Sequence, residues 1–390
     1  MEKTIKDLDI YISDGNYSSK YPRSEEFVKE GIPFIRGNNM VDGDISDDEM
    51  YYITPEKHAI LLKGHVKAGD VLITTRGNIG QVAIVPERHE DSNINAQIVL
   101  LRTNSKSLYN RYLLWALQSH RANEQYIALQ TGTALKQLPV GKLEKLSIKV
   151  ADIDEQHDIA NTLDKVYEVI KERRKELLLL DNLIKARFVE MFGECNNYEL
   201  LGEADIFISD GNYSSKYPTA DEFVTEGIPF IRASNMVNNT ITDDEMYYIS
   251  AEKHAELLKG HVKPNDVLIA TRGAGIGKIA VVPEKHNDSN INAQIVLLRC
   301  NKDIYNPLYL SWYMKLQETQ IKIQGLVSGS AQPQLPIKRL IQLTLLKPEI
   351  EMQNEFADFV HQVDKSKVVV KKALEQAQLL FDSLMQEYFG

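Results

Sequence analysis

An eleven-residue polar stretch, ISDGNYSSKYP, stands at Ile12–Pro22 and again, letter for letter, at Ile208–Pro218. Its Asp-Gly pair is a turn signal, and Asn, Tyr, Ser and Lys side chains follow it. Asn can bond bidentately to adenine, Ser and Lys can reach phosphates or base edges, and Tyr offers a flat apolar face with a polar tip. The stretch therefore predicts a DNA-contacting loop. The alternative is that Ser13 and Asp14 cap the turn while the tyrosines pack on the protein.

Arginines also recur at matching positions beside Gly or Asn, where a guanidinium group could approach guanine or a phosphate. We therefore take the repeated loop and these arginines, with the asparagine that follows the first of them, as candidate DNA-binding residues. In the first copy they are Asn16, Tyr17, Ser18, Ser19, Lys20, Tyr21, Arg36, Asn39 and Arg76. In the second copy they are Asn212, Tyr213, Ser214, Ser215, Lys216, Tyr217, Arg232, Asn235 and Arg272.

Motifs for catalysis or cofactor binding are not convincing in this sequence. RGAGIGK, at 272–278, lacks the first Gly of a phosphate-binding loop and is followed by Ile279 where Ser or Thr is required, so it is better interpreted as a tight hairpin turn. His58 and His65 recur in the second copy with the same spacing of seven, but no Cys or acidic partner accompanies them at metal-ligand spacing. We expect no catalytic residue, no cofactor and no metal.

The chain consists of two copies of one unit. GIPFIR recurs at Gly31 and Gly227, and LLKGHVK at Leu61 and Leu257, both with an offset of 196. After TRGNIG in the first copy and TRGAGIG in the second, the offset becomes 197 and stays so to the closing Phe-Gly pairs. Two units of this size are too few and too large for a solenoid.

The first 150 or so residues of each unit are typical of a mixed α+β globule. AGDVLITTRGNIGQVAIVPE, at 68–87, has two apolar runs around a Gly/Asn turn and predicts a hairpin. NINAQIVLLR, at 93–102, predicts another strand. LYNRYLLWALQSHRANEQYIALQ, at 108–130, predicts a helix.

The end of each unit predicts one long helix. Apolar residues at 154–192 and 351–389 follow the alternating steps of four and three that a coiled coil requires. Two such helices most simply pack as an antiparallel pair, in which polar seam residues such as Arg173 and Lys367 set the register or face another protein. The predicted seam comprises Leu163, Val166, Ile170, Leu177, Ile184, Val360, Val363, Val370, Leu374 and Phe381.

The domain limits that follow are a globule at 1–153, a helix at 154–193, a second globule at 194–350 and a second helix at 351–390. The two helices are identical at only eight of 39 aligned positions, whereas the globules share whole blocks. The two helices thus keep only the coiled-coil spacing of apolar residues, whereas the two globules keep particular residues. We infer that both globules bind the same target and that the helices hold them apart.

The composition of the chain indicates where in the cell the protein works more than it indicates what the protein does. The net charge of −10 over 390 residues is weak evidence against nucleic acid, because acids cluster in GDISDDEM and TDDEM and could point away from it. Only Cys195 and Cys300 are present, and no apolar run is long enough to span a bilayer. With no visible secretory signal at the first residues, these features predict a cytoplasmic protein without a membrane partner.

Over its full length the chain resembles the specificity subunits of Type I restriction–modification systems. The resemblance rests on EGIPFIRGNNM, GDVLITTRGNIGQVAIVPE, NINAQIVLLR and IDEQHDIANTLDKV, the last entering the first long helix. The same order returns as EGIPFIRASNM, NDVLIATRGAGIGKIAVVP, NINAQIVLLR and EIEMQNEFADFV. Each motif taken alone is only moderately specific for this family. Their occurrence in the same order twice is strong evidence for the resemblance.

The resemblance implies a target recognition domain in each globule, each reading one half of a bipartite sequence in double-stranded DNA. It also implies that the helices form a pseudo-two-fold spacer and dock two methyltransferase subunits, which bind S-adenosylmethionine and methylate adenine. Two restriction subunits, which translocate DNA with ATP and Mg²⁺, can join them. The specificity subunit itself performs no chemistry.

The chain departs from the family pattern in one respect, because recognition domains commonly differ while the helices are more alike. Here the globules are the more alike, and we hypothesise that both read the same half-site, which makes the target an inverted repeat. Two other readings stay open at this stage. One is a pseudo-dimeric DNA-binding regulator outside restriction, and the other is a coiled-coil scaffold with no role in DNA binding.

Overall fold

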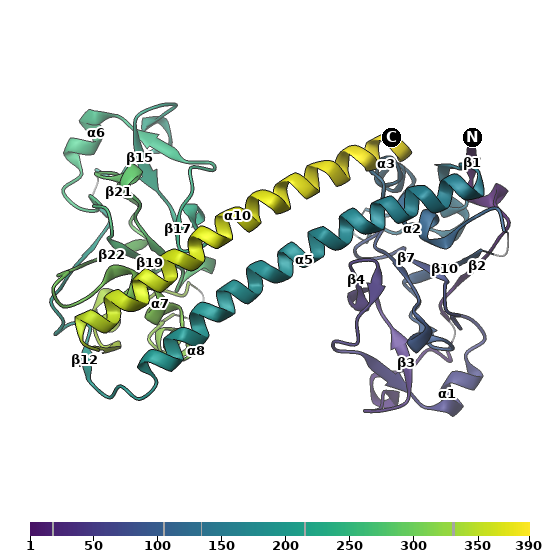
Figure 1. The fold of residues 1–390 in the computed structure, drawn as a ribbon, viewed down its shortest axis with the longest axis horizontal. Helices are drawn as coiled ribbons and strands as arrows, with labels where there is room; N and C mark the ends of the chain where they lie inside the picture. The colour runs from purple at the N-terminus through teal and green to yellow at the C-terminus, as the bar shows by residue number, and fades with distance from the viewer. Residues whose placement is uncertain (18, 104–105, 134, 214–215, 330–331) are drawn as a thin grey trace. The chain divides into compact units, whose positions relative to one another are not determined.

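The computed structural model describes residues 1–17, 19–103, 106–133, 135–213, 216–329 and 332–390. Its contacts divide the chain into two compact units (Figure 1). The first comprises Met1–Lys175 with Val370–Gly390, and the second comprises Glu176–Val369. Each unit therefore combines one globule with one end of each long helix. The domain limits inferred from the sequence stay a prediction.

The first globule is built on a four-stranded antiparallel sheet in the order β2-β10-β7-β8. The adjacent strands β7 and β8 pair with Ile73 opposite Val82, which confirms the predicted hairpin. The predicted strand at 93–102 forms the central strand β10 after a short strand β9. The bounds are β2 Ile10–Asp14, β7 Val71–Thr74, β8 Val82–Ile84, β9 Asn93–Ile94 and β10 Ile98–Thr103.

Smaller sheets complete this globule. A three-stranded sheet has the strand order β6-β3-β9, with β3 and β9 parallel. Two further sheets have two strands each, β1-β11 and β4-β5. The bounds are β1 Glu2–Thr4, β3 Ile32–Ile35, β4 Met40–Val41, β5 Asp44–Ile45, β6 Tyr51–Ile53 and β11 Ser147–Lys149. The short helices are α1 Pro55–Ile60, α2 Asn110–Gln118, α3 His120–Leu129 and α4 Val140–Leu143.

The second globule repeats this topology with one added edge strand, β14, and its sheets are β13-β22-β19-β20, β14-β18-β15-β21, β12-β23 and β16-β17. The strands of its main sheets are β13 Ile206–Asp210, β14 Phe223–Val224, β15 Ile228–Ile231, β18 Tyr247–Ile249, β19 Val267–Ala270, β20 Ile279–Val281, β21 Asn290–Ile291 and β22 Ile295–Cys300. The paired strands are β12 Tyr198–Leu200, β16 Met236–Val237, β17 Thr240–Ile241 and β23 Thr344–Leu346. The helices are α6 Ala251–Glu256, α7 Pro307–Lys315, α8 Gln317–Gly325 and α9 Ile337–Leu340.

The segment predicted as one helix at 108–130 is two helices, α2 and α3, so this prediction was wrong. Ser119 separates them in an extended conformation, and its hydroxyl accepts a hydrogen bond from the backbone N–H of Ala122. A serine in this position starts a new helix because it satisfies a backbone donor that has no partner within the helix. The break lets α2 pack on the sheet strands β7 and β8 while α3 packs on α2 and α4, with Ala122 and Tyr126 buried in the same core.

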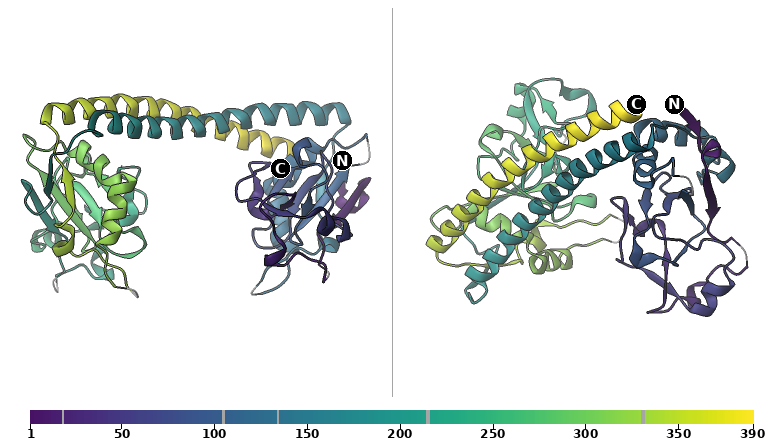
Figure 2. Two further views of the ribbon diagram at one scale, coloured as in Figure 1. Left: turned by 90° about the horizontal axis from the view of Figure 1, so that it is seen from below. Right: turned by 45° about the vertical axis from the view of Figure 1, so that its right-hand side comes forward.

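Two 40-residue helices, α5 (Ile153–Phe192) and α10 (Ile350–Phe389), run antiparallel within each unit (Figure 2). In the first unit, the rings of Tyr167 and Phe381 lie 5.6 Å apart. The Arg174 guanidinium lies 3.4 Å from the Gln378 side chain. In the second unit, the ammonium group of Lys367 lies 2.7 Å from the Asp181 carboxylate, so this polar seam residue fixes the register of the two helices.

None of the ten predicted seam residues is exposed. Six of them are buried, namely Leu163, Ile170, Ile184, Val360, Val363 and Val370. The other four are half-buried, namely Val166, Leu177, Leu374 and Phe381. Because the same helix faces also pack on the globules, each unit has one main apolar core that includes sheet, α2 or α7, and both long helices. In the described part of the chain, no helix has the length and apolar character needed to cross a membrane.

Candidate DNA-binding cleft

The repeated polar stretch begins inside the main sheet and leaves it at a glycine. Residues Ile12–Asp14 belong to β2, and the chain turns away at Gly15. A Cβ atom at Gly15 would lie 2.2 Å from the carbonyl oxygen of Asn95, so no other residue fits there without moving the loop. In the second copy, a Cβ atom at Gly211 would likewise lie 2.3 Å from the carbonyl oxygen of Asn292. Part of the identity between the two copies is thus a packing requirement.

The side chains around this glycine divide into anchors and exposed groups. Asp14 accepts a 2.9 Å ion-paired hydrogen bond from Lys63, and Asn16 is buried, at 8% exposure. Tyr17, Ser19 and Lys20 are exposed. The second copy has the pair Asp210–Lys259 at 3.3 Å, a half-buried Asn212, and exposed Tyr213 and Lys216. The predicted contacts Ser18, Ser214 and Ser215 lie outside the described residues.

Tyr17 and Arg76 meet although the sequence separates them by 59 positions. The Arg76 guanidinium carbon lies 4.6 Å from the centre of the Tyr17 ring, and both side chains are exposed. In the second copy, Arg272 lies 4.8 Å from the centre of the Tyr213 ring. Partial burial raises the pKa of Tyr17 above its ordinary value, and the arginine opposes this shift. The phenol is therefore neutral at pH 7 and can donate a hydrogen bond beside a fixed positive charge.

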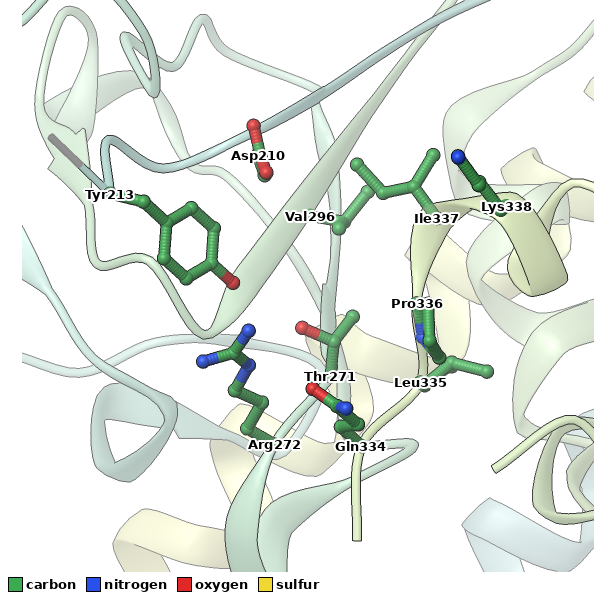
Figure 3. A pocket seen from close by; sticks show the side chains of 10 residues that line it. All are labelled: Asp210, Tyr213, Thr271, Arg272, Val296, Gln334, Leu335, Pro336, Ile337 and Lys338. Carbon is green, nitrogen blue, oxygen red and sulfur yellow. The ribbon is translucent and has the colours of Figure 1, made fainter. Parts of the chain in front are cut away.

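This pair forms one wall of a cleft that occurs in both globules. The cleft measures about 260 Å³ in the first copy and about 330 Å³ in the second. Figure 3 shows the Tyr213 ring and the Arg272 guanidinium on one side, with Pro336 and Ile337 across from them. The residues lining the first cleft are Asp14, Tyr17, Thr75, Arg76, Val99, Gln137, Leu138, Pro139 and Val140.

The opposite wall comes from a segment that the sequence reasoning missed. At its start, Thr131 and Gln137 exchange backbone hydrogen bonds of 2.8 and 2.9 Å, and Gln137, Leu138, Pro139 and Val140 line the cleft. The backbone of Gln137 also bridges to Arg76, which ties this loop to the cleft. The available signal was the tripeptide Gln-Leu-Pro, which recurs at Gln137 and Gln334 in otherwise different surroundings.

Arg36 and Asn39 do not line the cleft. The Arg36 guanidinium stacks 3.5 Å above the Tyr51 ring and donates a 2.6 Å hydrogen bond to the carbonyl of Glu49. Asn39 is fully buried, accepts from the Arg36 backbone N–H and donates to the carbonyl of Asp48. With no exposed surface, Asn39 braces its loop, and Asn235 is buried and bonded in the same way, so their contact with DNA stays a prediction.

Three further candidate residues pack against rings of the globule, as Arg36 does. Arg232 stacks 3.5 Å above the Tyr247 ring, as Arg36 does on Tyr51. Tyr21 packs its ring edge-on against buried Phe34, with 5.7 Å between the ring centres. Tyr217 does the same with Phe230. The structure thus brings together the tyrosine after the repeated Asn and the second arginine. The remaining aromatic and arginine candidates pack on neighbouring rings, and their contact with DNA stays a prediction.

Comparison with known proteins gives the chain a family. The model for the Type I restriction modification DNA specificity domain matches residues 2–179 and again 204–378. The chain belongs to this family. It is a DNA specificity subunit of a Type I restriction–modification system, and such a subunit is non-catalytic. The two matches correspond to the two repeats found in the sequence.

Individual relatives agree with this assignment. The chain is 24% identical over 378 residues to the putative type I restriction enzyme MjaX specificity subunit of Methanocaldococcus jannaschii, which covers 90% of this chain and 84% of that protein. It is 19% identical over 391 residues to the MjaVIII specificity subunit of the same organism, covering 94% and 84%. A 171-residue match at 24% identity to the EcoBI specificity subunit of Escherichia coli covers 42% of this chain and 35% of that protein.

Solved structures show the same fold at low sequence identity. The Type I restriction–modification S subunit from M. genitalium has a TM-score of 0.58 at 16% identity, covering 100% of this chain and 96% of that one. A chain from a study of complex assembly and conformational transition of the type I R-M system has a TM-score of 0.56 at 17% identity, covering 100% and 97%. The predicted family and α+β fold class are therefore confirmed.

The close approach at Gly15 gives a prediction for the specificity subunit. Gly15→Ala should lower the free energy of unfolding by about 1–3 kcal/mol, because the added methyl group must push the loop off the Asn95 carbonyl. The measurement is denaturant unfolding of the full chain. Gly141→Ala is the matched control, because a Cβ there meets nothing within 4 Å, and it should leave stability unchanged or slightly raised. Equal stability of the two variants would contradict the packing role.

Proposed function

We propose that each globule reads DNA through its cleft and that the two clefts read the same half-site. The supporting observation is the likeness of the linings. Eight of the nine residues lining the first cleft have an identical partner in the second, and the ninth pair is Val140 and Ile337. The second cleft is lined in addition by Lys338, which stands where the first repeat has Gly141. Because a base sequence is recognised by particular side chains at particular places, equal linings favour equal half-sites.

The cleft offers chemistry suited to this role. A guanidinium group can bind guanine bidentately or a phosphate. Arg76 lies over the Tyr17 ring, and no carboxylate among the residues that the structure describes forms an ion pair with it. Gln137 adds an amide, which can pair with adenine. We include Ser19 and Lys20, with Lys216 in the second copy, as groups beside the cleft that reach the DNA backbone.

The remaining parts of the proposal concern organisation. The domain limits are those inferred from the sequence, with globules at 1–153 and 194–350 as recognition domains and the long helices as the spacer between half-sites. Two methyltransferase subunits dock on the helices, restriction subunits can join, and the assembly works in the cytoplasm. The antiparallel helix pairing within each unit and the buried seam support a stiff spacer.

The experiment for this function is a map of N6-methyladenine in DNA exposed to the complex of this subunit with its methyltransferase. We expect one bipartite target whose halves are the same word in opposite directions, separated by a fixed unread gap. Two unrelated half-sites would refute the shared half-site. Methylation without any sequence preference would refute recognition by this subunit.

Matched variants then test the clefts themselves. Arg76→Ala and Arg272→Ala should each weaken binding of the complex to its target about tenfold or more, which is the cost of one bidentate contact, and the two losses should agree within about twofold. Affinity is measured at one fixed salt concentration, because the phosphate contribution changes with salt. Arg174→Ala removes the same charge from α5 and serves as the control. Unequal losses would show that the two clefts act differently.

The spacer gives a separate prediction. Four residues, or one helical turn, are inserted after Lys175 in α5 with a matching turn before Val370 in α10, at the boundaries between the units. The methylation map should then show a changed gap with unchanged half-sites, since only the helices between the globules are altered. A single turn inserted in α5 or α10 alone provides the comparison. An unchanged gap would show that another element sets the separation.

In the second unit, the middle parts of the two long helices, next to the boundary between the units, carry exposed apolar side chains. Leu178, Leu179 and Leu183 of α5 are about half exposed, and Val368 and Val369 of α10 are more so, at 66% and 69%. Large apolar side chains gathered in the open are typical of an interaction surface. We propose that the methyltransferase docks here, which follows from the partners implied by the family.

Substitution on this surface should therefore weaken assembly. Leu179→Glu with Val368→Glu should reduce copurification of the methyltransferase about tenfold or more, because a buried charge without a partner is costly in an interface. Stability of the isolated subunit should stay within about 0.5 kcal/mol, as expected for surface positions. Ile321→Glu, at a residue on α8 with 65% exposure, is the control. Full copurification of the double variant would place the docking surface elsewhere.

A further inference from the structure

A group of two histidines and one aspartate converges in the first globule, away from the cleft lining. His58 lies on α1, His65 lies in the loop before β7, and Asp91 lies in the loop before β9. The His58 Nε2 is 3.5 Å from one carboxylate oxygen of Asp91, and the His65 Nδ1 is 3.9 Å from the other. One ligand atom from each of the three residues lies within 4.8 Å of the other two.

The second globule contains the same group. His254 and His261 lie 3.4 Å from the two carboxylate oxygens of Asp288. In both copies the imidazole rings are 4.4 Å apart and inclined at 61–66°. The expectation of no metal site rested on local spacing, whereas the aspartate is 26 residues beyond the second histidine in the first copy and 27 in the second, far outside the spacing of a local ligand motif.

Hydrogen bonds to the outer ring nitrogens determine where the lone pairs point. The Nε2 of His65 donates to the backbone carbonyl of Leu61, which can only accept, so Nδ1 carries the lone pair toward Asp91. The Nδ1 of His58 is bonded to Oδ1 of Asn93, which leaves Nε2 facing the same point. This is the pattern of metal-binding histidines, whose second nitrogen is held by a carbonyl or carboxylate.

The distances also match coordination better than an ion pair. A hydrogen bond between imidazolium and carboxylate would be about 2.7–3.2 Å long, whereas the imidazole–carboxylate distances are 3.5 and 3.9 Å in the first copy and 3.4 Å in the second. Two imidazolium rings at 4.4 Å would also repel each other around a single carboxylate. Ligand atoms about 2.0–2.1 Å from a tetrahedral zinc ion are about 3.3 Å apart. The imidazole–carboxylate separations here are 3.4–3.9 Å, and the three ligand atoms of each group lie within 4.8 Å of one another.

From this geometry we propose that each globule binds one divalent transition metal ion of the zinc class through two imidazoles and one carboxylate. Imidazole ligands favour Zn²⁺, Co²⁺ or Ni²⁺ over Mg²⁺ and Ca²⁺, which take oxygen ligands. The His58 side chain is only 12% exposed while Asp91 is 74% exposed, so the ion binds at the rim with coordination positions left to water. The proposal is independent of how the clefts read DNA.

The position of the group gives the metal a structural role. The backbone of Ile94 donates to the carbonyl of Gly64, next to His65, and a Cβ at Gly64 would lie 3.2 Å from the Cα of Gly15. The ion thus ties α1, the loop before β7 and the loop before β9 together directly behind the repeated polar loop. Metal binding should stabilise the globule and stiffen the base of that loop.

The test uses the full chain, stripped with a chelator, dialysed, and titrated with Zn²⁺ or Co²⁺ as the probe. We expect two ions per chain, a Co²⁺ absorption spectrum typical of nitrogen and oxygen ligands, and a rise of about 5 °C or more in unfolding temperature at saturating zinc. Fewer than one ion per two chains, with no thermal shift, would overturn the proposal.

Variants separate the site from adventitious binding. Asp91→Asn keeps the shape and tolerates the left-handed backbone at φ 62°, so the chain should fold normally and bind one ion, and adding Asp288→Asn should reduce the count to none. His65→Gln with His261→Gln should also abolish binding. His120→Gln, at a side chain 81% exposed on α3, is the control and should keep two ions. Two ions retained by the double aspartate variant would overturn the proposed ligand set.

Discussion

Each globule closes its core with helix ends that come from distant parts of the chain, and the rest of the architecture depends on this exchange. In the first unit, Phe389 is 2% exposed, and its ring lies 5.1 Å from that of Tyr112. In the second unit, Phe188 and Phe192 of α5 pack on Phe356 of α10. Burial of these rings stabilises the globules and fixes the antiparallel helix pairing at the same time, since the same side chains serve both.

In each unit, only a few residues set the register in which the two long helices pair. A long apolar seam alone would allow neighbouring registers, and the pair of Lys367 with Asp181 selects one of them. The first unit lacks this lysine pair and uses aromatic packing between Tyr167 and Phe381 instead. Different side chains thus perform one structural task, which explains why the helices of the two copies diverged while the globules did not.

The sequence sufficed for the repeat, the β7–β8 hairpin and the long helices, because each depends on local periodicity or turn chemistry. It failed where tertiary contacts decide. Asn39 has the same loop signature as a DNA-contacting asparagine, and only its complete burial shows that it braces the backbone. The meeting of Tyr17 with Arg76, the contribution of Gln137, and the approach of Asp91 to two histidines all join segments that are far apart in sequence, and no pattern along the chain reports such pairs. The break at Ser119 is the exception, since a serine cap could have been weighed against the helical periodicity around it.

The exchange of helix ends has a consequence for how such a chain could arise. Phe389, which completes the first core, occupies the position in the second repeat that Phe192 occupies in the first. A polypeptide of one repeat would leave its own core open, and a second copy would close it by supplying the equivalent phenylalanine. The ancestral gene product in this view is a homodimer of half-length chains, and fusion of two gene copies kept the exchange of helix ends while each half diverged.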